Sequence, residues 1–218
     1  MEILFATDLP FGRCVAVALP IDEQEIAATL HPEEQAFAQT LGAGRRGGWI
    51  GGRVALRTAL QQLDVRLDAP LLATPRGAPL LPDGISGSVS HKRSIAVALV
   101  AKASGAGIGV DVEQVDPPRL SIAPRVLTER ERAHLATLHE EERWRDVLTR
   151  FSIKEAIYKA LDPFVQRHVA FSEVELAFSS DEMAVRFFLR EWEGPFEAAI
   201  HWFTHGEVII SSARVLKK

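Results

Sequence analysis

The chain carries an internal duplication, and this feature constrains the fold more than any other in the 218 residues. Residues 30–41 can be laid over residues 127–138 at an offset of 97, with two leucines, a glutamate, an alanine and a threonine identical in both copies. After four extra residues in the second copy, residues 54–60 lie over residues 155–161. We therefore expect two similar halves.

Hydrophobic periodicity predicts strands and helices in both halves. The predicted strands are residues 13–19, 85–90, 95–100 and 108–113, and the predicted helices are residues 32–41, 48–63, 128–138 and 140–161. The tail is predicted to form a small antiparallel sheet of four strands, with turns at residues 179–181 and 205–206. The fold class is therefore α+β.

A glycine-rich joint at residues 104–107 separates the two halves. It predicts an N-terminal α+β subdomain at residues 1–104 and a C-terminal α+β subdomain at residues 105–218. Where the second copy has Glu155 and Lys159, the first copy has Val54 and Thr58. We therefore expect one active site, assembled at the interface of two unlike halves.

Two acidic side chains interrupt an apolar strand at residues 109–113, which read Gly-Val-Asp-Val-Glu. Because successive side chains in a strand point to opposite faces, Asp111 and Glu113 share one face while the two valines take the other. Acids also occur on edge strands simply to discourage pairing, so this pattern alone does not indicate a site.

A second pattern lies at residues 151–160, where Glu155 and Lys159 share a helix face at i, i+4 spacing. This could be an ordinary surface pair, and Ser152 with Glu155 could form a capping box. However, the helical spacing of apolar residues runs from Trp144 into the motif, so the helix is expected to begin well before Ser152. Three carboxylates beside an ammonium would suit Mg²⁺ carrying substrate phosphates.

Together these two segments resemble the paired signature of the 4'-phosphopantetheinyl transferases. Residues 88–91, which read Ser-Val-Ser-His, residues 76–82, and residues 52–57 are also similar to segments of that family. The resemblance covers about residues 30 to 178 in the expected order, which makes it far more specific than any single motif. It implies the long, two-lobed type that activates surfactin or enterobactin synthetase, folded as a pseudo-twofold monomer with coenzyme A between its halves.

The resemblance implies a transfer of 4'-phosphopantetheine from coenzyme A to a serine of an apo carrier protein, with release of 3',5'-ADP. Mg²⁺, or Mn²⁺ as an alternative, would be held by Asp111, Glu113 and Glu155, and Lys159 would neutralise the leaving side. Glu155 is the favoured general base by analogy, while Glu113 or a water on the metal remains open. The expected partners are carrier proteins or domains of fatty-acid, polyketide and nonribosomal-peptide synthases.

Seven basic side chains of the N-terminal half are candidate phosphate ligands, because cationic side chains, guanidinium groups above all, bind phosphate oxygens well. These are Arg45, Arg46, Arg53, Arg57, Arg76, Lys92 and Arg93. The resemblance implies coenzyme A contacts for the following residues: Arg53, Arg57, Arg76, Ser90, His91 and Lys159. Ala78 stands where several family members have a lysine, which leaves Arg76 as the nearest substitute. The sequence does not assign roles to Arg45, Arg46 and Arg93.

Two other functions are compatible with the same carboxylates. One is a Mg²⁺-dependent pyrophosphohydrolase acting on coenzyme A or a nucleotide, although the glutamate-rich helix expected for it is missing. The other is a non-catalytic module that binds coenzyme A or a carrier protein, and the complete carboxylate and lysine set counts against it. The preferred carrier and its docking residues stay undetermined.

Composition argues against several further classes. A net charge of −4 and a pI near 6.0 argue against a general nucleic-acid binder. No apolar run approaches the roughly 18 residues that a membrane span needs, and Cys14 is the single cysteine, so it has no internal disulfide partner. The cytoplasm is the expected location.

Overall fold

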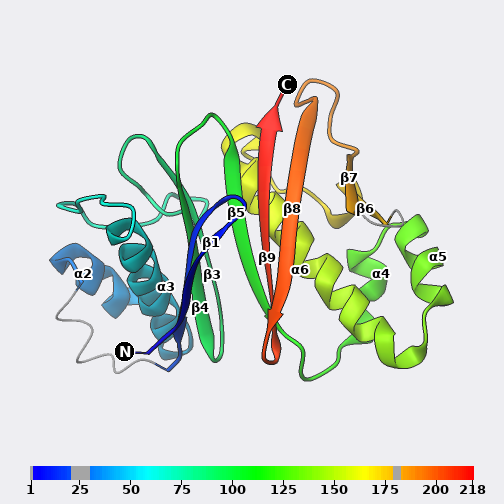
Figure 1. Ribbon diagram of the computed structural model, residues 1–218, viewed down its shortest axis with the longest axis horizontal. Helices are drawn as coiled ribbons and strands as arrows, with labels where there is room; N and C mark the ends of the chain where they lie inside the picture. The colour runs from blue at the N-terminus through cyan, green and yellow to red at the C-terminus, as the bar shows by residue number, and fades with distance from the viewer. Residues whose placement is uncertain (1, 21–29, 179–182) are drawn as a thin grey trace.

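Two antiparallel sheets form the centre of the protein, and helices lie on their outer sides (Figure 1). The computed structural model describes residues 2–20, 30–178 and 183–218. The first sheet contains β1 (Ile3–Leu9), β2 (Gly12–Ala18), β3 (Ile85–Lys92) and β4 (Ile95–Lys102), in the order β1-β2-β4-β3. The second contains β5 (Gly107–Gln114), β8 (Phe196–His205) and β9 (Val208–Lys217), in the order β5-β9-β8.

Each half of the chain has a pair of consecutive helices, and the short helix α4 precedes the pair of the C-terminal half. The N-terminal half contains α2 (Pro32–Thr40) and α3 (Ala43–Gln61), and the C-terminal half contains α4 (Ala123–Val126), α5 (Glu129–Thr137) and α6 (Glu140–Val165). Short 3₁₀ turns lie at Leu120–Ile122 and Phe171–Glu173, and β6 (Val174–Phe178) pairs with β7 (Met183–Phe187) as a separate ribbon.

The duplication seen in the sequence is confirmed by the topology. A helix pair in each half, α2–α3 or α5–α6, precedes the last two strands of its sheet. The three-strand order β2-β4-β3 of the first sheet matches β5-β9-β8 of the second. Within the described residues, β1 has no counterpart in the C-terminal half, and the β6–β7 ribbon has none in the N-terminal half.

Alternation along the strands builds three apolar layers. Val15 and Val17 of β2 face α3, whereas Cys14 and Ala16 face the second sheet. Val110 and Val112 of β5 face the first sheet in the same central layer, as the sequence predicts. The other face of β5, which carries Asp111 and Glu113, is therefore turned toward α6.

The tail differs from the prediction of one small sheet. Its last two strands, β8 and β9, join β5 through the β9 ladder, and only β6 and β7 form a ribbon of their own. A prediction from local pattern cannot see this pairing, because β5 and β9 are separated by most of the C-terminal half. β1 was not predicted, α3 begins earlier than expected and α6 ends later. The turn predicted at residues 179–181 lies outside the described residues.

The helices of the described residues include none with the length and apolar character to cross a membrane.

Candidate active site between the two sheets

The helix that carries Glu155 and Lys159 lies unusually close to β5. A methyl group added at Gly109 would come within 1.9 Å of the Ala156 carbonyl oxygen, and one at Gly107 would come within 1.9 Å of the Ala160 carbonyl oxygen. Glycine is therefore required at both strand positions, since any Cβ would collide with the helix backbone. This contact brings the carboxylates of β5 next to the polar face of α6.

Asp111 is the centre of the site. Its Oδ1 atom accepts hydrogen bonds from Lys159 Nζ at 2.8 Å and from Ser90 Oγ at 2.9 Å. Lys159 Nζ also donates to the Val110 carbonyl oxygen at 2.8 Å, so the ammonium is fixed against the strand. Asp111 Oδ2 is buried and has no hydrogen-bond partner among the described residues, which leaves one oxygen available to a ligand.

The surroundings of Glu113 and Glu155 disfavour the ionised form of both carboxyl groups. Burial and, after it, the charge of Asp111 raise the pKa of Glu113 to about 7, although a hydrogen bond from Lys92 opposes both effects. Burial and the charge of Asp111 also raise the pKa of Glu155. Because burial and the charge of Asp111 disfavour ionisation of both glutamates, a cation placed among these carboxylates would be favoured.

The three carboxylates do not form a finished ligand set. Among residues 2–20, 30–178 and 183–218, no three histidine, cysteine, aspartate or glutamate side chains lie close enough to hold a metal ion together. Glu113 Oε1 instead contacts Lys92 Nζ at 2.8 Å, and Asp111 Oδ1 contacts Lys159. Two ammonium groups therefore partly neutralise the carboxylate cluster.

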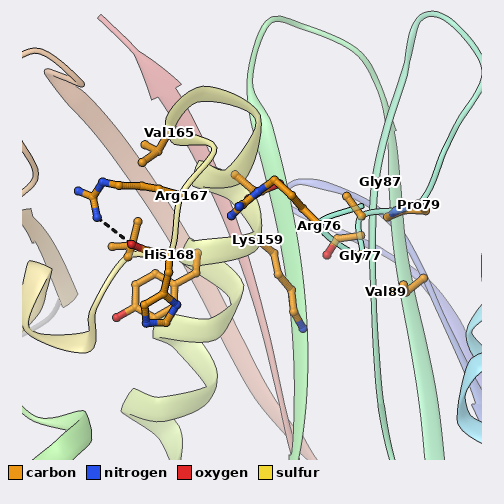
Figure 2. Close-up of a pocket in the computed structure, with 14 residues that line it drawn as sticks. Arg76, Gly77, Pro79, Gly87, Val89, Lys159, Val165, Arg167 and His168 are labelled. Atoms are coloured by element: carbon orange, nitrogen blue, oxygen red, sulfur yellow. Dashed lines mark hydrogen bonds and ion pairs between the residues drawn. The ribbon is translucent and has the colours of Figure 1, made fainter. Parts of the chain in front are cut away.

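Two adjacent pockets lie at this site, and one of them is lined by carboxylates of the cluster. The Arg76 pocket is a cavity of about 260 Å³. Arg76 and β3 lie on one side of it, and Lys159 of α6 and Arg167, which follows this helix, lie on the other (Figure 2). The Glu155 pocket, of about 640 Å³, contains Glu113 and Glu155. His168 lines both pockets, so they are adjacent at that residue.

Arg76 is engaged in an ion pair across the Arg76 pocket. Its Nε and Nη2 atoms both lie 2.6 Å from Asp162 Oδ1 near the end of α6. A phosphate that binds Arg76 would have to compete with this carboxylate. The pair also joins the first half of the chain to the second.

His91 packs directly on α3. A methyl group at Gly48 would lie 2.4 Å from His91 Nδ1, so only glycine leaves room for the ring. Burial lowers the pKa of His91, and the charges of Lys159, Lys92, Arg45 and Arg53 lower it further. The ring is therefore surrounded by cations, which makes this end of β3 a favourable place for an anion.

Sequence comparisons match both halves of the chain to one family. Residues 33–101 match the 4'-phosphopantetheinyl transferase N-terminal domain, and residues 107–209 match the 4'-phosphopantetheinyl transferase superfamily. The 4'-phosphopantetheinyl transferase Svp of Streptomyces mobaraensis is 35% identical over 82% of this chain and 73% of its own length. The chain belongs to the 4'-phosphopantetheinyl transferase superfamily.

Other relatives of this transferase agree. The 4'-phosphopantetheinyl transferase PptT of Mycobacterium tuberculosis is 31% identical over 78% of this chain and 71% of its own. The solved holo-[acyl-carrier-protein] synthase of Thermotoga maritima overlaps 51% of this chain and 64% of its own, at 26% identity and a TM-score of 0.44, which is too partial a likeness to add to the assignment.

Arg53 and Arg57 of the transferase make contacts within the first half, although the sequence predicts coenzyme A contacts for both. Arg57 pairs with the buried Glu34, with Nη2–Oε1 at 2.9 Å and Nε–Oε2 at 3.2 Å. Arg53 is buried, donates to the Leu72 carbonyl oxygen and lies over the Trp49 ring. The placement of Arg57 therefore does not support the expected contact with coenzyme A, because its charge is already satisfied inside the first half. The charge of Arg53 still reaches His91.

Sequence reasoning missed several residues that line the two pockets of the transferase. Asp162, Arg167 and His168 fall in no recognised motif, and the sequence indicates Lys92 only as a candidate phosphate ligand, not as a partner of Glu113. Arg167 is held by ion pairs at 2.6 Å to both Glu173 and Glu193. Only Asp162 carries a local signal, since it stands one turn after Lys159 on the same helix.

Proposed function

We propose that the transferase moves 4'-phosphopantetheine from coenzyme A to a serine hydroxyl of an apo carrier protein and releases 3',5'-ADP. The observation that carries this proposal is the adjacency of a cationic pocket and a carboxylate cluster at the boundary between the two halves. Phosphoryl-type transfer needs cations for the phosphates, carboxylates for a metal and a proton acceptor for the attacking hydroxyl, and the cleft offers all three.

Coenzyme A would bind with its charged end among the basic residues. Arg76, Lys159 and His91 supply donors that suit the pyrophosphate and the 3'-phosphate. Ser90 can donate to a phosphate oxygen once Asp111 Oδ1 is satisfied by Lys159. Arg53 would contribute long-range charge, since its side chain is almost fully buried.

The donor set fits a hard divalent cation. Asp111 Oδ2 is buried without a partner among the described residues, and burial together with the charge of Asp111 destabilises the charged forms of Glu113 and Glu155. Asp111, Glu113 and Glu155 would hold Mg²⁺ or Mn²⁺ through oxygen, the ligand type that both ions prefer. When bound, the ion supplies Lewis-acid stabilisation of the pyrophosphate oxygens.

Proton transfer would fall to the glutamates. A catalytic base works best with a pKa near the working pH, and burial raises the pKa of both Glu113 and Glu155 toward that range. Glu155 is the favoured acceptor of the serine proton and Glu113 the alternative. Lys159 would keep Asp111 oriented and place a positive charge beside the leaving phosphate.

The Glu155 pocket suits the pantetheine arm and the carrier. Its walls combine apolar side chains, including Phe151 and Phe171, with Arg93, Arg119 and Arg125. An acidic carrier surface would complement these arginines. The class of carrier, the monomeric state and the cytoplasmic location stay predictions.

The test is intact-mass spectrometry of several apo carrier proteins incubated with the transferase, coenzyme A and Mg²⁺, beside a sample with EDTA. A metal-dependent gain of one phosphopantetheine is expected. Asp111→Ala and Glu155→Ala should lower the rate by at least about 100-fold, while Glu141→Gln on the exposed start of α6 should leave it unchanged. Cleavage of coenzyme A without a carrier would indicate the hydrolase, and binding without turnover would indicate the module.

A further inference from the structure

Lys92 forms an ion pair that crosses the boundary between the two halves. It is the last residue of β3, and Glu113 stands near the end of β5. Lys92 Nζ lies 2.8 Å from Glu113 Oε1, with 39% of the lysine side chain and 11% of the glutamate side chain exposed. Both residues line the Glu155 pocket.

The ammonium of Lys92 acts on more than one carboxylate. It opposes the burial and the Asp111 charge that disfavour ionised Glu113, and it opposes the same two influences at Glu155. Other charged or titratable groups also face this end of β3: Lys159, His91, Arg45 and Arg53 surround it, and Arg93, Arg119, Arg125 and His168 line the same pocket as Lys92. Lys92 therefore stands where a positive charge stabilises the ionised forms of both glutamates of the cluster.

This pair occupies one oxygen of the carboxylate cluster. Asp111 Oδ2 has no partner among the described residues, whereas Glu113 Oε1 is occupied by Lys92. A divalent cation that used Glu113 Oε1 would have to displace the ammonium, and the two cations would repel each other at close range. Metal binding and the Lys92–Glu113 contact would then be mutually exclusive at that oxygen.

We propose that Lys92 is a displaceable counter-cation that occupies Glu113 and sets the affinity of the carboxylate cluster for its divalent cation. This inference rests on the proposed function, because it takes Asp111, Glu113 and Glu155 as the metal ligands. Lys92 is a positioning residue, since it acts through Glu113. Because the pair joins β3 to β5, loading of the metal also releases one contact between the two halves.

The test measures metal binding without substrate. Mn²⁺ is titrated into the protein without coenzyme A or carrier, and free Mn²⁺ is followed by electron paramagnetic resonance at about pH 8.5, where protonation of Glu113 competes least. Lys92→Met should tighten the Mn²⁺ Kd about tenfold. Lys92→Arg, which keeps the charge, should stay within about threefold of the parent, and an unchanged or weaker Kd in Lys92→Met would overturn the proposal.

Two controls separate a specific effect from a general one. Lys102→Met removes the same charge from the opposite end of the β3–β4 ladder and should leave the Mn²⁺ Kd unchanged. In a Glu113→Gln background, Lys92→Met should no longer tighten Mn²⁺ binding, because the oxygen it protects has lost its charge. An equal tightening in either control would overturn the proposal, since it would show a general field effect.

The outcome is distinguishable from failure of the proposed function. Absence of phosphopantetheine transfer by the parent protein, with Mn²⁺ bound, would reject the transferase reaction without touching the Lys92 proposal. Normal transfer together with an unchanged Mn²⁺ Kd in Lys92→Met would reject the Lys92 proposal alone. Circular dichroism of each variant confirms that the fold is retained, which the half-exposed position of Lys92 favours.

Discussion

Glu34 and Glu131 occupy equivalent positions in the two halves and accept equivalent hydrogen bonds. Glu34 caps its own helix at the His31 N–H, accepts the Leu71 N–H and pairs with Arg57. Glu131 caps its helix at the Thr128 N–H, accepts the Leu176 N–H and pairs with Lys154. Both are buried, and their separation of 97 residues is the offset of the sequence duplication. Through equivalent contacts, Glu34 therefore links α2 to α3 and Glu131 links α5 to α6.

Removing the charge at Glu131 should cost more stability than removing it at Glu34. Glu131→Gln leaves the fully buried Lys154 ammonium without its carboxylate, which should lower the free energy of unfolding by about 3 to 5 kcal/mol. Glu34→Gln should cost about 1 to 3 kcal/mol, because Arg57 is 18% exposed and can be hydrated. Urea denaturation of both variants checks the order, and an equal cost would contradict it.

Gly109→Ala should separate α6 from β5. The new methyl group would collide with the Ala156 carbonyl oxygen, and moving a helix backbone costs about 1 to 3 kcal/mol or more. The shift would also move Glu155 and Lys159 away from Asp111, so transfer should fall by at least about 100-fold. Gly52→Ala is the matched control, since its methyl group would meet Val89 at an ordinary 3.9 Å. Thermal denaturation and the mass assay report the two effects, and full activity in Gly109→Ala would contradict the expected geometry.

Gly48→Ala should displace His91 without unfolding the protein. The methyl group would fall 2.4 Å from His91 Nδ1, and the imidazole can rotate away more easily than a backbone can move. If His91 binds a phosphate of coenzyme A, its loss should weaken coenzyme A binding about tenfold, the value of one hydrogen bond to a charged group. Gly44→Ala, whose methyl group would meet nothing within 4 Å, is the control. Calorimetric titration with coenzyme A measures both, and equal affinities would argue against a ligand contact by His91.

Glu113 should make the protein less stable as pH rises through the weakly acidic range. Its pKa is raised from the ordinary 4.5 to about 7 in the folded protein, so the folded state holds this proton more tightly than the unfolded state. The free energy of unfolding should therefore fall by about 3 kcal/mol between about pH 4.5 and pH 7 and level off above. Glu113→Gln should remove this component.

The measurement compares the parent with Glu113→Gln by urea denaturation at pH 5 and pH 8, with EDTA present. The free energy of unfolding of the variant minus that of the parent should be about 2 kcal/mol larger at pH 8 than at pH 5. A difference that is constant with pH would show that Glu113 titrates normally.

Much of the site follows from local pattern. Strand alternation alone predicts that Asp111 and Glu113 point away from Val110 and Val112, and the packing confirms it. Helical spacing alone places Glu155 and Lys159 on one face, and Lys159 does reach Asp111. The duplication predicts two matching halves, because residues that repeat in the same order at one offset fold into the same elements.

Only the tertiary structure decided which charges meet. Arg57 and Arg53 look alike on a helix, yet Arg57 is taken by Glu34 and Arg53 is buried over Trp49. The contact of Lys92 with Glu113 depends on β3 lying beside β5, and no local pattern encodes that distance. Periodicity fixes the face on which a side chain lies, whereas ion pairing depends on separations of a few ångströms between elements that are remote in the chain. The sequence thus determined the donors of this site, and the packing of the two halves determined their partners.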